Sequence, residues 1–185
     1  MTEIIAEIGK GVGALMPQEW DALNNGNPFT SHAFLTTLET SGSVGLGSGW
    51  SPAPIVIRNE SGALSGALPA YLKSHSQGEY VFDHHWADAY QRAGGQYYPK
   101  LQIAAPFSPV PGPRLLLSDP ALGPQMLAAA EAVVQQNSLS SVHATFVEEA
   151  QLPDFRAADW LIRTGTQFHW RNDGYADFDG FLNAL

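Results

Sequence analysis

The spacing of apolar and polar residues changes many times along this chain, which predicts many short elements. Alternating or short continuous apolar runs predict strands at 3–8, 53–58, 63–72, 78–83, 101–105, 114–117, 142–147 and 160–170. Apolar residues at helical spacing, with Ser, Pro or Gly near the ends, predict helices at 17–23, 31–42, 86–93, 124–134, 152–159 and 175–185. This order predicts an α/β protein built around a mixed sheet.

Local signals support three of these elements. The turn Asn-Glu-Ser-Gly at 59–62 joins the strands on either side of it into a hairpin. Ser31 is expected to cap the second helix. The last helix is expected to turn Phe178, Phe181 and Leu182 inward, and it has no termination signal, so we expect more chain to follow it.

The stretch 71–117 mixes aromatic, basic and imidazole side chains in a way that no single period explains. It contains four of the nine basic residues, three of the six histidines and eight aromatic residues. Ordering thirty irregular residues costs on the order of 30–60 kcal/mol. Burying eight aromatic rings returns about 20 kcal/mol. We therefore expect the rings to hold the segment in place, which leaves its charged and imidazole groups as functional candidates.

Composition narrows the function classes. A length of 185 residues predicts one domain over 1–185, and a net charge of −9 argues against a dedicated DNA- or RNA-binding protein. The absence of cysteine excludes disulfides and thiolate nucleophiles. No signal peptide and no apolar run long enough for a membrane span are visible, so we expect a cytoplasmic protein.

Two motifs that suggest ligands have simpler explanations. Glycines 9, 11 and 13 surround Lys10 but lack the ending of a phosphate-binding loop, which favours a strand-to-helix turn. His84 and His85 are adjacent, so their side chains point in different directions and seldom share an ion. We expect no metal.

General acid–base chemistry is the first candidate function of the central stretch. Glu79 and Asp83 lie four residues apart among aromatic residues that could raise a carboxyl pKa, with His75 nearby. The alternative is that both carboxylates only pair with basic residues of the stretch. Those basic residues are Lys73, Arg92 and Lys100.

Anion or substrate binding is the second candidate. Lys73, Lys100 and Arg114 border Pro- and Gly-rich loops, and Arg114 precedes an apolar strand, so it should be buried beside an anionic partner. That partner could be a carboxylate of the protein or a phosphate of a ligand. Gln167 and His169 would share the polar face of the last strand. Tyr97 and Tyr98, close to Lys100 in the chain, complete the substrate-binding candidates, and His143 is expected to be a core histidine.

Several long motifs resemble the FemAB-like family of predicted N-acyltransferases, described as peptidoglycan biosynthesis or recognition proteins. They are NPFTSHAFLTTLETSGSVG with the later Gly49-Trp50, LKSHSQGEYVFDHHWADAY, YYPKLQIAAPFSPVPGPRLL and QFHWRNDGYADFDGFL. The resemblance implies a GNAT-like fold of the α/β (α+β) class, with a mixed, mostly antiparallel central sheet flanked by helices. Relatives carry two such domains in tandem, and this chain resembles the first. The usual pyrophosphate-binding loop of GNAT acetyltransferases is not visible, and 109–114 occupies its place.

The resemblance implies transfer of an acyl or aminoacyl group from a thioester or ester to an amine. Glu79 or Asp83, through His75, would take the proton of the amine. The donor would be acyl-CoA or aminoacyl-tRNA, and the acceptor a small molecule or a peptide. A second GNAT-like domain or a homodimer is the expected partner. The alternative is a non-catalytic module that recognises peptidoglycan or peptide, or a structural half-domain that pairs with a second acyltransferase domain.

Overall fold

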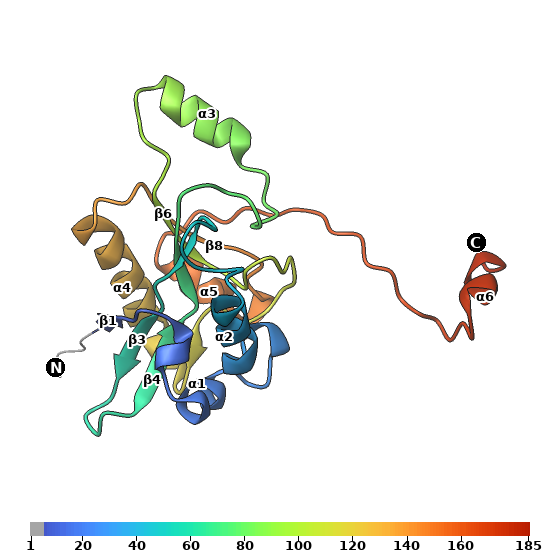
Figure 1. Cartoon of the computed structure of the whole chain (residues 1–185), viewed down its shortest axis with the longest axis horizontal. Helices are drawn as coiled ribbons and strands as arrows, with labels where there is room; N and C mark the ends of the chain where they lie inside the picture. Colours follow the sequence, from blue (N-terminus) through green and yellow to red (C-terminus); the bar gives the residue numbers. More distant parts are fainter. Residues whose placement is uncertain (1–5) are drawn as a thin grey trace.

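Eight short strands form two four-stranded sheets in the computed structural model of the chain, which describes residues 6–185 (Figure 1). The strands are β1 Ala6–Ile8, β2 Trp50–Pro52, β3 Ile55–Arg58, β4 Leu64–Leu68, β5 Ala70–Lys73, β6 Lys100–Ile103, β7 Leu116–Leu117 and β8 Val142–Ala144. The helices are α1 Pro17–Leu23, α2 His32–Thr40, α3 His84–Arg92, α4 Gly123–Gln136, α5 Leu152–Ala157 and α6 Phe178–Leu182. Short 3-10 helices lie at Val12–Ala14, Pro28–Thr30, Pro120–Leu122 and Glu149–Gln151. The predicted mixed, mostly antiparallel α/β class is confirmed.

The two sheets are joined through shared chain. The first has the order β1-β3-β4-β7 and the second β2-β5-β6-β8, with β6–β8 as the parallel pair. Only Pro69 separates β4 from β5, and only Ala53 and Pro54 separate β2 from β3. The Ala53 amide donates to the Ala70 carbonyl at 2.9 Å, so pairing continues across the break. Because proline cannot donate to a ladder, these prolines divide one long hairpin between two sheets.

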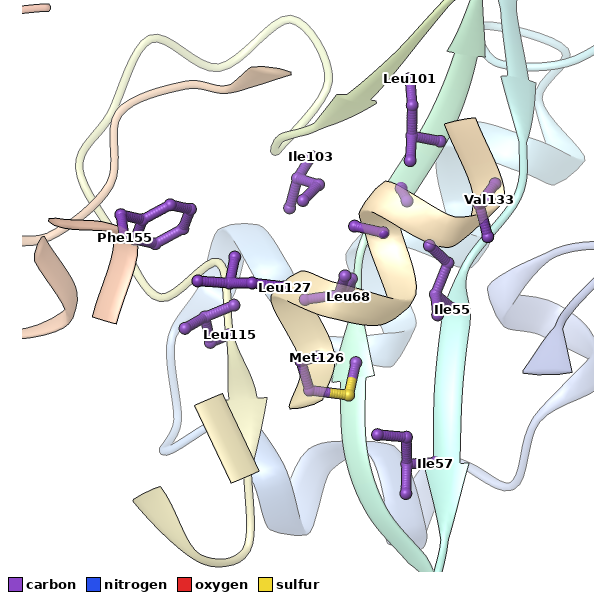
Figure 2. Close-up of a cluster of buried hydrophobic side chains, with 12 residues drawn as sticks. Ile55, Ile57, Leu68, Leu101, Ile103, Leu115, Met126, Leu127, Val133 and Phe155 are labelled. Carbon is purple, nitrogen blue, oxygen red and sulfur yellow. The ribbon is translucent and has the colours of Figure 1, made fainter. Parts of the chain in front are cut away.

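Helix α4 covers one face of both sheets. Ile55 and Leu68 of the first sheet and Leu101 and Ile103 of the second point at α4, as Figure 2 shows. Met126, Leu127, Ala130 and Val133 form the facing side of the helix. The apolar spacing that predicted this helix therefore also identified the face that it buries.

The opposite face of the first sheet is covered by α1 and α2. Val56 and Ala67 pack there against Trp20 and Leu35. The predicted cap of α2 is confirmed, because the Ser31 hydroxyl accepts from the Phe34 amide at 3.2 Å. The first sheet is thus apolar on both faces.

The opposite face of the second sheet has a different cover. An irregular segment runs over it from Ser74 to Asp83, continues into α3, and returns to β6. Figure 1 shows α3 projecting from the body of the molecule. We call residues 74–83 the lid segment.

Several local predictions are wrong. The chain at 78–83 is not a strand, because Tyr80 and Phe82 have positive φ angles of 58° and 52°. The chain at 160–170 has no strand, and β2 was not predicted. The predicted strand at 3–8 is confirmed for β1, while 3–5 lies outside the described residues.

The expected role of the aromatic residues is also wrong in part. Tyr71 and Tyr97 are buried, but five of the eight rings are exposed: Tyr80 and Phe82 of the lid segment, Trp86 and Tyr90 of α3, and Phe107. Phe178 and Leu182 of α6 are exposed as well instead of facing a core. These rings are therefore not what holds the segment in place.

Candidate functional site

Strand register places two lysines opposite each other on the second sheet. Lys73 of β5 is the partner of Lys100 of β6, and Trp50 of β2 is the partner of Lys73 on the other side. All three side chains lie on the face away from α4 and are fully buried. Like charges directly opposite each other destabilise a sheet, so this pair needs compensation.

The lid segment supplies the compensating charge. Lys100 Nζ lies 2.9 Å from Glu79 Oε2 and 2.7 Å from Asp83 Oδ2. Lys73 Nζ lies 3.9 Å from Glu79 Oε1. The ion pairs that were the structural alternative for Glu79 and Asp83 therefore form, with Lys100 and Lys73 and not with Arg92. Together these four residues are the buried charge cluster.

Three hydroxyl groups surround the cluster. Lys100 Nζ donates to Ser76 Oγ at 2.9 Å, and Ser76 Oγ lies 2.8 Å from the Tyr98 hydroxyl. The Tyr97 hydroxyl donates to Asp83 Oδ2 at 2.8 Å. The predicted substrate-binding tyrosines thus lie beside the predicted acid–base residues: Tyr97 bonds directly to the Asp83 carboxylate, and Tyr98 bonds to Ser76.

Trp50 fastens the lid segment over the lysines. Its ring lies 3.6 Å below Lys73 Nζ, and its indole N–H donates to the Gln77 carbonyl at 3.0 Å. Lys73 Nζ donates to the same carbonyl at 3.2 Å. The cation–π contact lets a buried ammonium remain next to an apolar ring. Gly78, with φ 80°, leaves room for Phe107 to pack on Trp50.

Burial and neighbouring charges shift the pKa values of the cluster in different directions. Burial raises the pKa of Glu79, against the opposing effects of Lys100 and Lys73. Burial would also raise the pKa of Asp83, but hydrogen bonds from Lys100 and other donors outweigh it and hold this pKa at about 2. Burial lowers the pKa of Lys73 to about 8. Glu79 is therefore the carboxylate suited to exchange a proton, and Asp83 the one that stays charged.

Four buried side-chain oxygens of the described residues lack a hydrogen-bond partner, and all belong to this side of the second sheet. They are Glu79 Oε1, Asp83 Oδ1, Tyr71 OH and Gln102 Oε1. Tyr71 and Gln102 are partners in the β5–β6 register, two residues along from the two lysines. Unpaired buried polar atoms are costly and rare, and they concentrate at functional sites. The polar face of the second sheet is therefore the candidate site.

Arg114 lies apart from the charge cluster. Its side chain is buried and donates to the carbonyls of Thr145 at 2.7 Å, Val110 at 2.9 Å and Pro113 at 3.1 Å. Among residues 6–185 no carboxylate forms an ion pair with it, so of the two expected partners the carboxylate of the protein is not found. Burial lowers its pKa to about 10. In this structure Arg114 holds the Pro-rich loop against the chain after β8.

The remaining predicted site residues lie outside the cluster. His75 is half-buried, accepts from the Gln77 amide at 3.3 Å, and packs against Gly49, where any side chain would collide with it. Gln167 and His169 are exposed: Gln167 donates to the Pro109 carbonyl at 2.8 Å, and its other amide atom contacts His169 at 3.2 Å. None of the three contacts Glu79 or Asp83.

Sequence reasoning missed Ser76, Trp50 and the hydrogen bond between Ser141, just before β8, and His143 of β8. Ser141 Oγ lies 2.8 Å from His143 Nε2, and burial lowers the pKa of His143 to about 4. The sequence did contain a signal for the polar face of the second sheet. Lysine, tyrosine and glutamine alternate with apolar residues in AYLK and KLQI, although an ordinary buried strand would carry apolar residues at these positions.

Two further properties limit the chemistry. No group of three or more His, Asp or Glu side chains within the described part of the chain is arranged to hold a metal ion. None of the helices from residue 6 onward is long and apolar enough to cross a membrane.

Comparison with known proteins gives the family. A search of curated proteins and a search of solved structures each found no match. The family model FemAB-like, described as peptidoglycan biosynthesis/recognition, matches residues 11–185, which is nearly the whole chain. The chain therefore belongs to the FemAB-like family of peptidoglycan biosynthesis and recognition proteins.

Proposed function

We propose that this chain is an N-acyltransferase in which Glu79 takes the proton of the attacking amine. One observation carries the proposal. Glu79 is a buried carboxylate with a raised pKa, held by Lys100 through one oxygen while its other oxygen has no hydrogen-bond partner. A positioned carboxylate whose pKa is raised toward the working pH is suited to general base catalysis.

In the proposed reaction, residues of the buried charge cluster take up and return every proton that is transferred. The amine nitrogen attacks the carbonyl carbon of a thioester or ester donor, a C–N bond forms, and the amine proton passes to Glu79 Oε1. The C–S or C–O bond of the donor breaks, and Lys73 gives a proton to the leaving thiolate or alkoxide. Glu79 then returns its proton to Lys73, whose Nζ lies 3.9 Å from Oε1. A lysine pKa of about 8 is close to that of a thiol, which suits this exchange.

Substrate access in this proposal requires movement of the lid segment. Glu79, Lys73 and Lys100 are all fully buried. The lid segment contains three positive φ angles, at Gly78, Tyr80 and Phe82, and such conformations at non-glycine residues carry strain. Release of that strain favours an open state in which Glu79 faces the substrates while Lys73 and Lys100 stay on the sheet.

The family membership supports an acceptor from peptidoglycan, and the chemistry requires an amine, so we propose a peptide amine of peptidoglycan precursors as the acceptor. The donor is an acyl-CoA or an aminoacyl-tRNA. We further propose that residues 1–185 act as one GNAT-like domain. Both donor classes are made inside the cell, which places the proposed reaction in the cytoplasm.

Transfer to a defined acceptor tests the proposal. The full chain is incubated with a lysine-containing peptidoglycan tripeptide and either acetyl-CoA or aminoacyl-tRNA, and the acylated peptide is detected by mass spectrometry. The expected result is product with one donor, lowered at least about 100-fold by Glu79→Gln. The matched control Asp88→Asn removes an exposed carboxylate on α3 and should leave the yield unchanged.

The alternative function is recognition without catalysis, which the complete burial of the charge cluster favours. Saturable binding of the tripeptide in calorimetry, with no product from either donor and no effect of Glu79→Gln on binding, would establish recognition and overturn the acyltransferase proposal.

A further inference from the structure

The C-terminal residues 161–185, which we call the arm, leave the body of the molecule. Trp160, just before the arm, is anchored to the body through packing on Phe155 and a 2.7 Å hydrogen bond to Glu131 of α4. Beyond it, the bond from Gln167 to Pro109 is the one hydrogen bond that returns to the body from the described arm residues. Figure 1 shows the arm extending away and ending in α6.

The tip of the arm is ordered around one ring. Trp170, Tyr175 and Phe178 each pack on Phe181, with ring centroids 5.9, 5.6 and 5.8 Å away. The Asp177 carboxylate caps α6 by accepting from the Gly180 amide at 2.8 Å. The tip is therefore a preformed aromatic unit and not a random tail.

The arm carries a large exposed apolar surface. Its large exposed apolar residues, with their exposed fractions, are Leu161 94%, Ile162 38%, Phe168 98%, Trp170 64%, Phe178 69%, Leu182 49% and Leu185 88%. At 150–250 Å² for an aromatic side chain, they leave on the order of 800 Å² of apolar surface in water. Exposed apolar surface on this scale is typical of interaction surfaces.

A second uncovered aromatic surface lies on α3. Trp86 and Tyr90 lie four residues apart, so they share one side of the helix, and Phe82 lies in the chain just before it. They are 74%, 63% and 48% exposed. Polar residues occupy the other side: His84, His85, Asp88, Gln91 and Arg92. We call the three rings the α3 stripe.

We propose that the arm of one chain docks on the α3 stripe of a second copy of the same chain, forming a symmetric dimer by reciprocal exchange. Each chain carries both surfaces, which is what a two-fold interface requires. The arm is held in a direction that leads away from its own body, so a second copy is the occupant that the geometry favours. A standard stable interface buries about 800 Å² per partner, and the exposed apolar surface of the arm is of that size.

Light scattering after size-exclusion chromatography of the full chain tests the stoichiometry. We expect a species of twice the 19.9 kDa chain mass. Phe178→Asp and Trp86→Asp should each raise the dimer dissociation constant at least about tenfold, because each buries a charge in an apolar contact. Asp173→Asn changes an exposed polar residue of the arm and should leave the dimer intact.

A circular-dichroism melt of each variant checks that the body remains folded. A chain that stays monomeric at all concentrations overturns the proposal. So does a dimer that both aspartate variants leave unchanged.

Cross-linking tests the contact itself, and the chain suits it because it has no cysteine. Ala89→Cys lies beside the α3 stripe and Asn183→Cys lies on the arm tip, and neither removes a ring. Mixing the two differently tagged single variants with a short bismaleimide should give a cross-linked heterodimer, which Phe178→Asp in the arm partner reduces at least tenfold. In the double variant, cross-linking at monomer mass would show that the arm docks on its own chain and would overturn the proposal.

Discussion

The two sheets share one helix and one long hairpin, yet their other faces differ completely. Helix α4 packs on apolar residues of both sheets. On the far side, α1 and α2 cover the first sheet with apolar contacts such as Trp20 on Ala67. The irregular lid segment covers the second sheet and brings two carboxylates onto two lysines. The two sheets therefore share their backbone framework. They differ in the segment that covers the face away from α4 and in the side chains that point toward that segment.

This difference separates stabilising burial from functional burial. Apolar side chains on the first sheet gain free energy on leaving water, by roughly 25 cal/mol per Å². Buried ion pairs rarely gain more than they lose in hydration, so apolar residues at the same positions would often stabilise the fold as well or better. The polar face of the second sheet is therefore better explained by a chemical role than by stability, and the variants below test that distinction.

The largest effect is expected from Lys100→Met. The change leaves Glu79 and Asp83 buried without their closest cation, and breaking one partner of a buried ion pair costs about 3–5 kcal/mol of unfolding free energy. Urea denaturation at pH 7 measures it. Lys10→Met, which removes an exposed lysine, is the control and should change the unfolding free energy by less than about 0.5 kcal/mol. A Lys100→Met protein as stable as the parent would mean that the cluster does not carry charge at neutral pH.

A smaller loss is expected from Leu101→Ala, one residue along the same strand and on the opposite face. Removing a fully buried leucine side chain from the core under α4 should cost about 3 kcal/mol. Because the residues of this core are apolar, the loss should be the same from pH 5 to pH 9. A loss that varies with pH would contradict the separation of the two faces.

Lys73→Met should change how the free energy of unfolding depends on pH more than it changes that free energy at pH 7. The folded pKa of Lys73 is about 8 and its ordinary value is 10.5. Between these values the unfolded chain keeps a proton that the folded chain has lost, so stability rises with pH across this window. The variant should lack this rise, on the order of 2 kcal/mol, in urea denaturation at pH 8 and pH 10.5. Identical slopes for the two proteins would contradict the burial of a charged Lys73.

The smallest effect is expected from Tyr97→Phe, which removes the hydrogen bond to Asp83 and should cost about 1 kcal/mol. Tyr90→Phe is the matched control, because it removes a hydroxyl from an exposed ring and should cost nothing measurable. Equal melting temperatures for Tyr97→Phe and Tyr90→Phe would show that this hydrogen bond does not stabilise the lid.

The sequence predicted the first sheet and its helices well because their signals are local. The 59–62 turn, the Ser31 cap and the spacing of Val133 and its neighbours each operate within a few residues, and each was confirmed. Residue type alone also made candidate site residues of Lys73, Lys100, Glu79 and Asp83. It could not pair them, because a strand register across 27 residues brings Lys73 opposite Lys100.

Two segments were mispredicted because their residue patterns require a neighbouring strand or a core to pack on, and the structure places neither beside them. The alternation at 160–170 is that of a strand, but no neighbouring strand within the described chain pairs with it. Phe178 and Leu182 are spaced for a buried helix face, but α6 lies away from the core. The strand prediction for 78–83 is wrong for another reason. The positive φ angles at Tyr80 and Phe82 follow from tertiary contacts and leave no local signal in the sequence.

The pH dependence of the acyl-transfer rate tests the central claim most directly. With the donor that gives product, kcat/KM is measured for the parent chain and for Glu79→Gln across the acid range. If Glu79 is the base, the parent rate rises as the carboxyl loses its proton, with a midpoint above the ordinary glutamate value of 4.5, because its pKa is raised. Glu79→Gln should lose this rise and at least about 100-fold in rate. A folded Glu79→Gln protein with the rate and pH profile of the parent would contradict the assignment of Glu79 as the base.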